Sequence, residues 1–236
     1  MSIPIVGQKR GYFISFEGLD GAGKSTQIDL LRQALQKNGF TVRMLREPGG
    51  NNISEAIREI VKNPKLKDMC PEAELLLMNA SRAQLVREVI RPALDAGEIV
   101  LCDRFFHSTI VYQGWGRGID LDIIKAMIHF AVEDTVPNVT FVLWLSIPEI
   151  ERRKKDRGTK DRIESEKHPE FTKRVNQGYV WLAEQEPSAK GRIVGIEATG
   201  TKEGIHNEIY RCVAARISGL DENQLQMDAG KKIIKV

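Results

Sequence analysis

The chain has 236 residues, of which 42% are hydrophobic and 28% charged, and a formal net charge of +3. A chain of this length can bury a large core, although length alone also allows two small domains. The low net charge excludes a strong general field for polyanions, so we expect no nucleic-acid partner. No apolar run suits a signal peptide or a membrane span. The three cysteines show no disulfide or metal spacing, so we expect a cytoplasmic protein.

Short apolar runs alternate with longer helical patterns along the chain. The predicted strands are residues 12–16, 41–45, 99–102, 139–145 and 193–196. The predicted helices are residues 24–38, 52–62, 72–94, 121–132, 149–155, 170–184 and 202–218. This alternation predicts a three-layer α/β fold with a doubly wound parallel sheet. Residues 1–10 are expected to form an N-terminal extension, and residues 219–236 a C-terminal tail.

A glycine-rich segment lies between the first predicted strand and the first predicted helix. Residues 18–25 read GLDGAGKS and match the pattern GxxxxGK[ST] of a phosphate-binding loop. The backbone N–H groups of such a loop point at phosphate oxygens, and the following helix adds its positive N-terminal end. The alternative is a glycine-rich turn that binds nothing. The predicted phosphate-binding residues are Gly18, Asp20, Gly21, Ala22, Gly23, Lys24, Ser25 and Thr26.

An apolar strand that ends in a carboxylate supplies a second part of a nucleotide site. Asp103 follows the strand at residues 99–102. In P-loop proteins a carboxylate at this place and the loop hydroxyl, here Ser25, hold Mg²⁺, while the loop lysine, here Lys24, reaches the β- and γ-phosphates. The guanine-binding motif NKxD is absent from the sequence. These features predict an ATP-binding protein that uses Mg²⁺.

Several further motifs occur in a fixed order. They are REPGG at residues 46–50, SRAQ at 81–84, DR at 103–104, HSTIVYQGWGRG at 107–118 and DRIE at 161–164. With the phosphate loop, this set resembles the thymidylate kinases, particularly the bacterial type, from about residue 12 to about residue 200. The resemblance implies a P-loop nucleoside monophosphate kinase domain at residues 11–218. It implies transfer of the γ-phosphate of ATP to dTMP, with Mg²⁺, by a homodimer.

The chemistry of that reaction agrees with the residues present. A phosphate monoester acceptor is already anionic near neutral pH, so no side chain has to deprotonate it. Catalysis then depends on aligning two phosphates and neutralising their charge, which requires lysines and arginines. By the resemblance, Arg82 and Arg104 hold the dTMP phosphate. The alternatives are a solvated helix arginine for Arg82 and an ion pair with the adjacent Asp103 for Arg104.

The resemblance also assigns residues to the nucleoside. Asp20 is expected to meet the sugar 3′-hydroxyl, and Glu47 and Pro48 to form a turn against the nucleoside in which a cis peptide is plausible. The expected contacts around the base and the sugar 2′ position come from a short segment. They are Ser108, Thr109, Tyr112 and Gln113. A buried structural role remains the alternative for Tyr112, and a turn-capping role for Ser108.

Met78 departs from the family pattern. The family has an aromatic ring there that stacks on the thymine, whereas methionine is flexible and covers a base without enforcing one geometry. The change predicts a looser base pocket, and ordinary core packing of Met78 is the alternative.

A basic segment at about residues 151–165 is predicted to form a lid. Gly21 stands where some thymidylate kinases carry an arginine, so the catalytic charge is expected from the lid instead. The first candidate is Arg157, followed by Arg153 and Arg162. A solvated helix face is the usual alternative for such a run.

Other functions remain open from the sequence alone. One is a kinase for another or a modified pyrimidine deoxynucleoside monophosphate, and another is a P-loop ATPase switch without a small acceptor. The homodimer rests mainly on the resemblance. Its candidate surface is the apolar helix that contains Leu75, Leu76, Leu77, Leu85 and Val86, and the alternative is that this surface covers the sheet.

Overall fold

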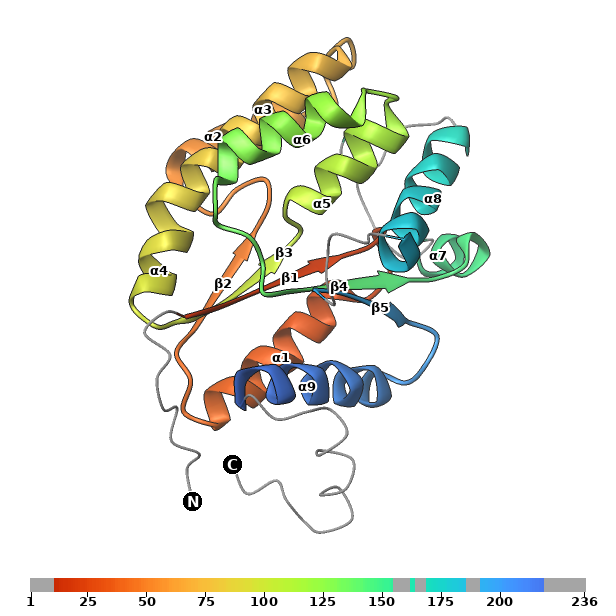
Figure 1. Ribbon diagram of the computed structural model, residues 1–236. Helices are drawn as coiled ribbons and strands as arrows, with labels where there is room; N and C mark the ends of the chain where they lie inside the picture. Colours follow the sequence, from red (N-terminus) through yellow and green to blue (C-terminus); the bar gives the residue numbers. More distant parts are fainter. Residues whose placement is uncertain (1–10, 155–161, 164–168, 186–191, 219–236) are drawn as a thin grey trace.

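A computed structural model describes residues 11–154, 162–163, 169–185 and 192–218 (Figure 1). The predicted N-terminal extension, the predicted C-terminal tail and Arg157 lie outside these residues. The described strands form one parallel sheet in the order β2-β3-β1-β4-β5. Their bounds are β1 (Tyr12–Glu17), β2 (Val42–Arg46), β3 (Ile99–Asp103), β4 (Val139–Trp144) and β5 (Ile193–Glu197). All five strands were predicted, and the predicted parallel sheet is confirmed.

The helices connect these strands in chain order. The predicted helix at residues 72–94 appears as three successive segments, the middle one π-helical. The sequence prediction missed α5 and η2, because their polar and glycine residues show no helical period. The helical segments are α1 (Lys24–Lys37), α2 (Asn52–Lys62), α3 (Pro71–Leu85), η1 (Val86–Ile90), α4 (Arg91–Asp95), α5 (Phe106–Thr109), η2 (Ile110–Gly116), α6 (Leu121–Val132), α7 (Ile147–Lys154), α8 (Pro169–Gln185) and α9 (Lys202–Ser218).

The sheet lies between two layers of helices, as the sequence predicted. Figure 1 shows α1 and α9 along one face, and α3, α4 and α6 along the other. Alternate residues of β1 serve the two layers: Ile14 and Phe16 join the core that contains α1 and α9, whereas Phe13 joins the core that contains α3 and α6. This period of two fits a strand buried on both faces. In the described part of the chain, no helix has the length and apolar character of a membrane span.

The topology brings two functional segments together at the carboxyl edge of the sheet. β1 is central, and the chain continues to β2 and β3 on one side before it crosses to β4 on the other. Ligands of open α/β sheets bind at such a switch point. Phe16 of β1 pairs with Asp103 of β3, so the loop after β1 and the residues after β3 lie side by side.

Glycine permits close contact between η2 and α8. A Cβ added at Gly178 of α8 would lie 2.8 Å from Cγ of Trp115 in η2, and one at Gly116 would lie 2.7 Å from the ring of Phe171. Both distances are too short for real side chains. The residue after Gly178 is Tyr179, which reaches the candidate site described below, so this packing positions a functional side chain.

We therefore expect Gly178→Val to destabilise the protein by about 1–3 kcal/mol, the usual cost of overpacking a core contact. Chemical denaturation measures the free energy of unfolding. The control is Gln177→Ala, one residue away on the exposed side of α8. If Gly178→Val were as stable as the wild type, the close packing of η2 against α8 at this glycine would not be required.

Candidate active site

The side chain of Lys24 folds back onto the phosphate loop that precedes it. Gly18, Gly21 and Gly23 all have positive φ angles (133°, 95° and 96°), a region that glycine enters without a steric penalty. The Nζ atom of Lys24 donates to the carbonyl oxygens of Gly18 at 2.9 Å and Leu19 at 3.2 Å. Burial and the charge of Arg104 lower the pKa of Lys24. The loop therefore holds a desolvated cation at the N-terminal end of α1.

Ser25 and Asp103 form a pair that fits a magnesium ion. The Ser25 hydroxyl donates to Oδ2 of Asp103 at 3.1 Å. The other carboxylate oxygen, Oδ1, is buried and has no hydrogen-bond partner among the described residues. Mg²⁺ binds hard oxygen ligands and keeps several waters, so one carboxylate and one hydroxyl are an adequate protein contribution. These two residues would hold the ion beside the phosphate loop.

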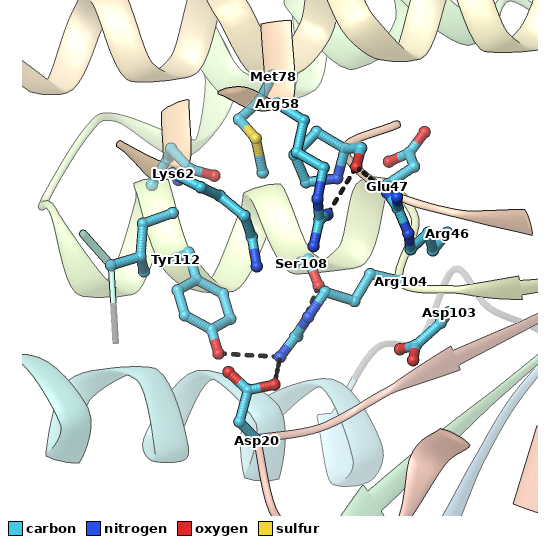
Figure 2. Close-up of a pocket in the computed structure, with 13 residues that line it drawn as sticks. Asp20, Arg46, Glu47, Arg58, Lys62, Met78, Asp103, Arg104, Ser108 and Tyr112 are labelled. Atoms are coloured by element: carbon cyan, nitrogen blue, oxygen red, sulfur yellow. Dashed lines mark hydrogen bonds and ion pairs between the residues drawn. The ribbon is translucent and has the colours of Figure 1, made fainter. Parts of the chain in front are cut away.

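Arg104 lies beside the phosphate loop with its guanidinium fixed on several sides. It donates to Oδ1 of Asp20 at 2.8 Å and to the hydroxyls of Tyr179 at 2.8 Å, Ser108 at 3.1 Å and Tyr112 at 3.3 Å. Figure 2 shows the guanidinium between Asp20 and Tyr112. The expected alternative, an ion pair with Asp103, is not the arrangement seen here, because the recorded carboxylate partner is Asp20.

Glu17, the last residue of β1, organises the groups that hold Arg104. It is fully buried and accepts from the backbone N–H groups of Phe105 at 2.8 Å and Ser108 at 3.2 Å. Its other oxygen lies 2.6 Å from the Ser108 hydroxyl and 3.1 Å from that of Tyr179. Because both hydroxyl protons point at Glu17, the oxygen lone pairs of Ser108 and Tyr179 are left to accept from Arg104.

The Arg104 guanidinium remains charged in this setting. Burial alone would lower the pKa of Arg104, but Tyr112 and Asp20 raise it well above its ordinary value. Burial raises the pKa of the Tyr112 hydroxyl, which therefore stays protonated. A fixed, permanently charged fork is suited to bidentate recognition of a phosphate group.

Arg82, which was predicted to hold the dTMP phosphate, forms a buried ion pair in this structure. Its side chain is 1% exposed, and its Nη2 and Nε atoms lie 2.6 and 2.8 Å from Oε2 of Glu47. It does not line the pocket. It is also not the solvated arginine of the alternative interpretation, because the ion pair with Glu47 is buried. In this structure Arg82 fixes Glu47, and the peptide between Glu47 and Pro48 is cis, as the sequence suggested.

A pocket runs from the phosphate loop towards α3. In Figure 2, Asp20 lies at one end and Met78 at the other. Arg46, Arg58 and Lys62 were not predicted as site residues, yet they add three basic side chains to its wall. The repeat of Arg58 and Lys62 four residues apart on α2 was the signal available in the sequence. The lining residues are Asp20, Arg46, Glu47, Pro48, Arg58, Lys62, Met78, Asp103, Arg104, Ser108, Tyr112, Gln113 and Ile163.

The Met78 end of the pocket carries an unsatisfied polar group. Met78 is 7% exposed and lines the pocket, so it is both buried and available to a ligand. Gln113 also lines the pocket and is fully buried, and its carbonyl oxygen has no partner among the described residues. The Thr109 hydroxyl likewise has none, although Thr109 is not among the residues that line the pocket. Buried polar atoms normally have hydrogen-bond partners, so the Gln113 oxygen points to a polar ligand.

Two of the three arginines predicted for the lid, Arg153 and Arg162, lie in the described part of the chain. Arg153 donates to Glu149 at 2.7 Å and to the carbonyl oxygen of Ala198 at 3.0 Å. Arg162 is buried and donates to the carbonyl oxygen of Val61 at 2.8 Å and to Glu74 at 2.6 Å. Both guanidinium groups therefore have partners within the chain, and the contacts of Arg162 lie on α2 and α3.

The buried carboxyl of Glu47 makes stability depend on pH. Burial raises its pKa from 4.5 to about 7, although Arg82 opposes the shift. The folded protein therefore binds this proton more tightly than the unfolded chain. Relative to Glu47→Gln, the wild type should lose stability as the pH rises from 4.5 to about 7, and the difference should then level off. Denaturation of both proteins across pH 5–8 measures it, and a constant difference would contradict the shift.

Comparison with known proteins agrees with this geometry. Residues 16–209 match the family model described as Thymidylate kinase. A thymidylate kinase of Exiguobacterium sp. (strain ATCC BAA-1283 / AT1b) is 44% identical over 207 residues, covering 88% of this chain and 96% of that protein. One of Kosmotoga olearia is 42% identical over 199 residues, covering 84% and 93%. The crystal structure of thymidylate kinase from Ehrlichia chaffeensis superposes with a TM-score of 0.69 at 30% identity, over 86% of this chain and 98% of that one. The chain belongs to the thymidylate kinase family.

Proposed function

We propose that this protein transfers the γ-phosphate of ATP to dTMP and so forms dTDP. The observation that carries the proposal is the placement of Arg104, held by Asp20, Ser108, Tyr112 and Tyr179 at the pocket that borders the phosphate loop. A fixed cation beside a phosphate loop suits a reaction in which the donor and acceptor phosphates must be aligned.

The donor site uses the loop after β1. Its backbone N–H groups would cradle the ATP phosphates, and Lys24 would turn from the carbonyl oxygens of Gly18 and Leu19 to the β- and γ-phosphates. Mg²⁺, held by Ser25 and Asp103, would neutralise phosphate charge. Gly21, Ala22 and Thr26 complete the predicted cradle.

The acceptor site uses the pocket wall. Arg104 would hold the dTMP phosphate, with Arg46 and Arg58 contributing positive charge. Asp20 would meet the 3′-hydroxyl, and Tyr112 would crowd the sugar 2′ position. The base would reach the far end of the pocket, which Met78 and Gln113 line, and Thr109 stays a predicted base contact.

Arg82 takes a supporting role in this proposal. Its buried pair with Glu47 would fix the turn that contains Pro48, which is part of the pocket wall. Its predicted contact with the dTMP phosphate stays part of the proposal and requires Arg82 to leave Glu47 when the substrate binds.

We also propose that residues 151–165 act as the lid and that a lid arginine stabilises the transferring phosphate. Arg157 remains the first candidate. Arg153 would have to leave Glu149 to act there, and Arg162 would have to leave Glu74.

The homodimer is a further proposal, and α3 and α6 support it. These helices pack together and expose Leu76, Ile123 and Phe130, whose exposed fractions are 56%, 55% and 81%. Of the apolar α3 and η1 residues predicted for the interface, Leu75, Leu85 and Val86 instead belong to the core. We place the enzyme in the cytoplasm, because Cys70, Cys102 and Cys212 form no disulfide, which suits a reducing compartment.

The direct test is ADP release from ATP-Mg²⁺ in the presence of dTMP, dUMP, dCMP, UMP, AMP or GMP. We expect dTMP to be preferred, with UMP excluded by Tyr112 and the purines by the size of the pocket. Equal use of several pyrimidine nucleotides would favour the broader kinase. Slow ADP release that no acceptor accelerates would favour an ATPase switch.

Replacing Arg104 tests the acceptor site separately. Arg104→Gln should lower kcat/KM for dTMP by about 10²–10³-fold, as expected for loss of a preorganised charge contact, while the KM for ATP changes little. The control is Arg87→Gln, which removes a half-exposed arginine paired with Glu133 on the surface. A variant affected only in ATP binding would move Arg104 from the acceptor side to the donor side.

A further inference from the structure

A second buried carboxylate, Glu74, lies beside the base end of the pocket. Glu74 is on the first turn of α3 and is 1% exposed. It accepts from Nε2 of Gln113 at 2.7 Å, from Nη2 of Arg162 at 2.6 Å and from Arg117 at 3.2–3.3 Å. Met78 follows one helical turn later, so Glu74 and Met78 share the inner face of α3. The carboxylate thus joins a pocket residue, Gln113, to two arginines.

The arginines keep Glu74 ionised. Burial alone would raise the pKa of Glu74, but the hydrogen bonds and charge of Arg117, together with Gln113 and Arg162, lower it. An ionised carboxylate can only accept hydrogen bonds. The amide group of Gln113 must therefore turn its NH₂ group towards Glu74, and its carbonyl oxygen must point away.

The carbonyl oxygen of Gln113 is thereby presented without a partner. Gln113 is fully buried and lines the pocket, and its Oε1 atom has no hydrogen-bond partner among the described residues. A buried acceptor without a donor is unfavourable, so the site gains most from a ligand that supplies one.

Nucleobases differ at the atom that would meet this oxygen. Thymine and uracil carry a hydrogen-bond donor at N3, whereas N3 of cytosine is an acceptor. We propose that Glu74 is a positioning residue for base selection, because it holds the Gln113 amide so that the carbonyl oxygen accepts from N3–H of the base and rejects cytosine. The inference rests on the proposed function and deepens it by naming a residue that sets base choice.

The wild-type protein provides the first measurement. In 5-methyl-dCMP the methyl group, sugar and phosphate of dTMP are retained, while the hydrogen-bonding pattern becomes that of cytosine. We expect its kcat/KM to be about 10²-fold or more below that of dTMP, since a site built around a hydrogen bond strongly rejects an analogue that cannot form it. dUMP, which keeps N3–H and loses only the methyl group, should fall by about 10–200-fold.

Variants of Glu74 then test the positioning. In Glu74→Gln the residue can accept or donate, so the Gln113 amide can turn, and the preference for dTMP over 5-methyl-dCMP should fall at least tenfold. Glu74→Asp retains a carboxylate and should keep most of the preference. Glu72→Gln makes the same change on the exposed side of the same helix and should match the wild type. The ratio of kcat/KM for dTMP to kcat/KM for 5-methyl-dCMP reports on positioning. General damage to the protein lowers both values together and leaves this ratio unchanged.

A second variant covers the case in which Glu74→Gln does not fold. The triple variant Glu74→Leu, Arg117→Met and Arg162→Met replaces the buried carboxylate and both of its arginines by apolar side chains, an exchange that folded proteins often tolerate. It should lose the preference to the same extent. An unchanged preference in either folded variant would overturn the proposal.

The two proposals fail in different ways. If the wild type binds ATP but does not use dTMP, the proposed function fails, and calorimetric binding of dTMP and 5-methyl-dCMP still measures the preference. If the wild type uses dTMP and 5-methyl-dCMP equally, the kinase stands and the role of Glu74 is overturned.

Discussion

The buried carboxyl group of Glu17 is the constraint on which the site depends. The carboxylate sits at the end of the central strand, fully buried, and burial raises its pKa. It is tolerated because two backbone N–H groups and the hydroxyls of Ser108 and Tyr179 point at it. The same two hydroxyl groups accept hydrogen bonds from the Arg104 guanidinium. Satisfying one buried group therefore fixes the start of α5, a tyrosine of α8 that lies 162 residues away along the chain, and the orientation of Arg104.

The same logic recurs at two other points of the pocket. Glu47 and Glu74 are buried carboxylates, each paired with an arginine from another element. Removing one partner of such a pair is costly, because the other is left as an uncompensated charge. Each carboxylate thus ties separate segments together: Glu47 joins the end of β2 to α3, and Glu74 joins α3 to η2. The pocket wall is consequently held in place by electrostatics as well as by apolar packing.

The sequence predicted those features that depend on local pattern. The five strands, the phosphate loop and Asp103 follow from periodicity and short motifs, and the structure contains them all. The partner of Arg82 was not predictable, because Glu47 lies 35 residues away and no local signal joins them. In the sequence, nothing distinguishes Glu17 from any other polar residue at the end of a strand. Its role depends on α5 and α8, which contact it only in the folded chain. The helical form of residues 106–116 was hidden by glycines and polar side chains that propensity assigns to a loop.

Asp20 is shared between the two halves of the site. Its carboxylate lies 2.8 Å from Arg104 and 3.5 Å from Lys24, one cation from each side. A phosphate that binds Arg104 competes for the charge that Asp20 now satisfies and leaves this carboxylate more available to Lys24. The free energies of binding the two substrates are consequently linked, and by reciprocity each substrate must alter the affinity for the other by the same factor. A single side chain in the phosphate loop thereby acts as an energetic coupling between donor and acceptor.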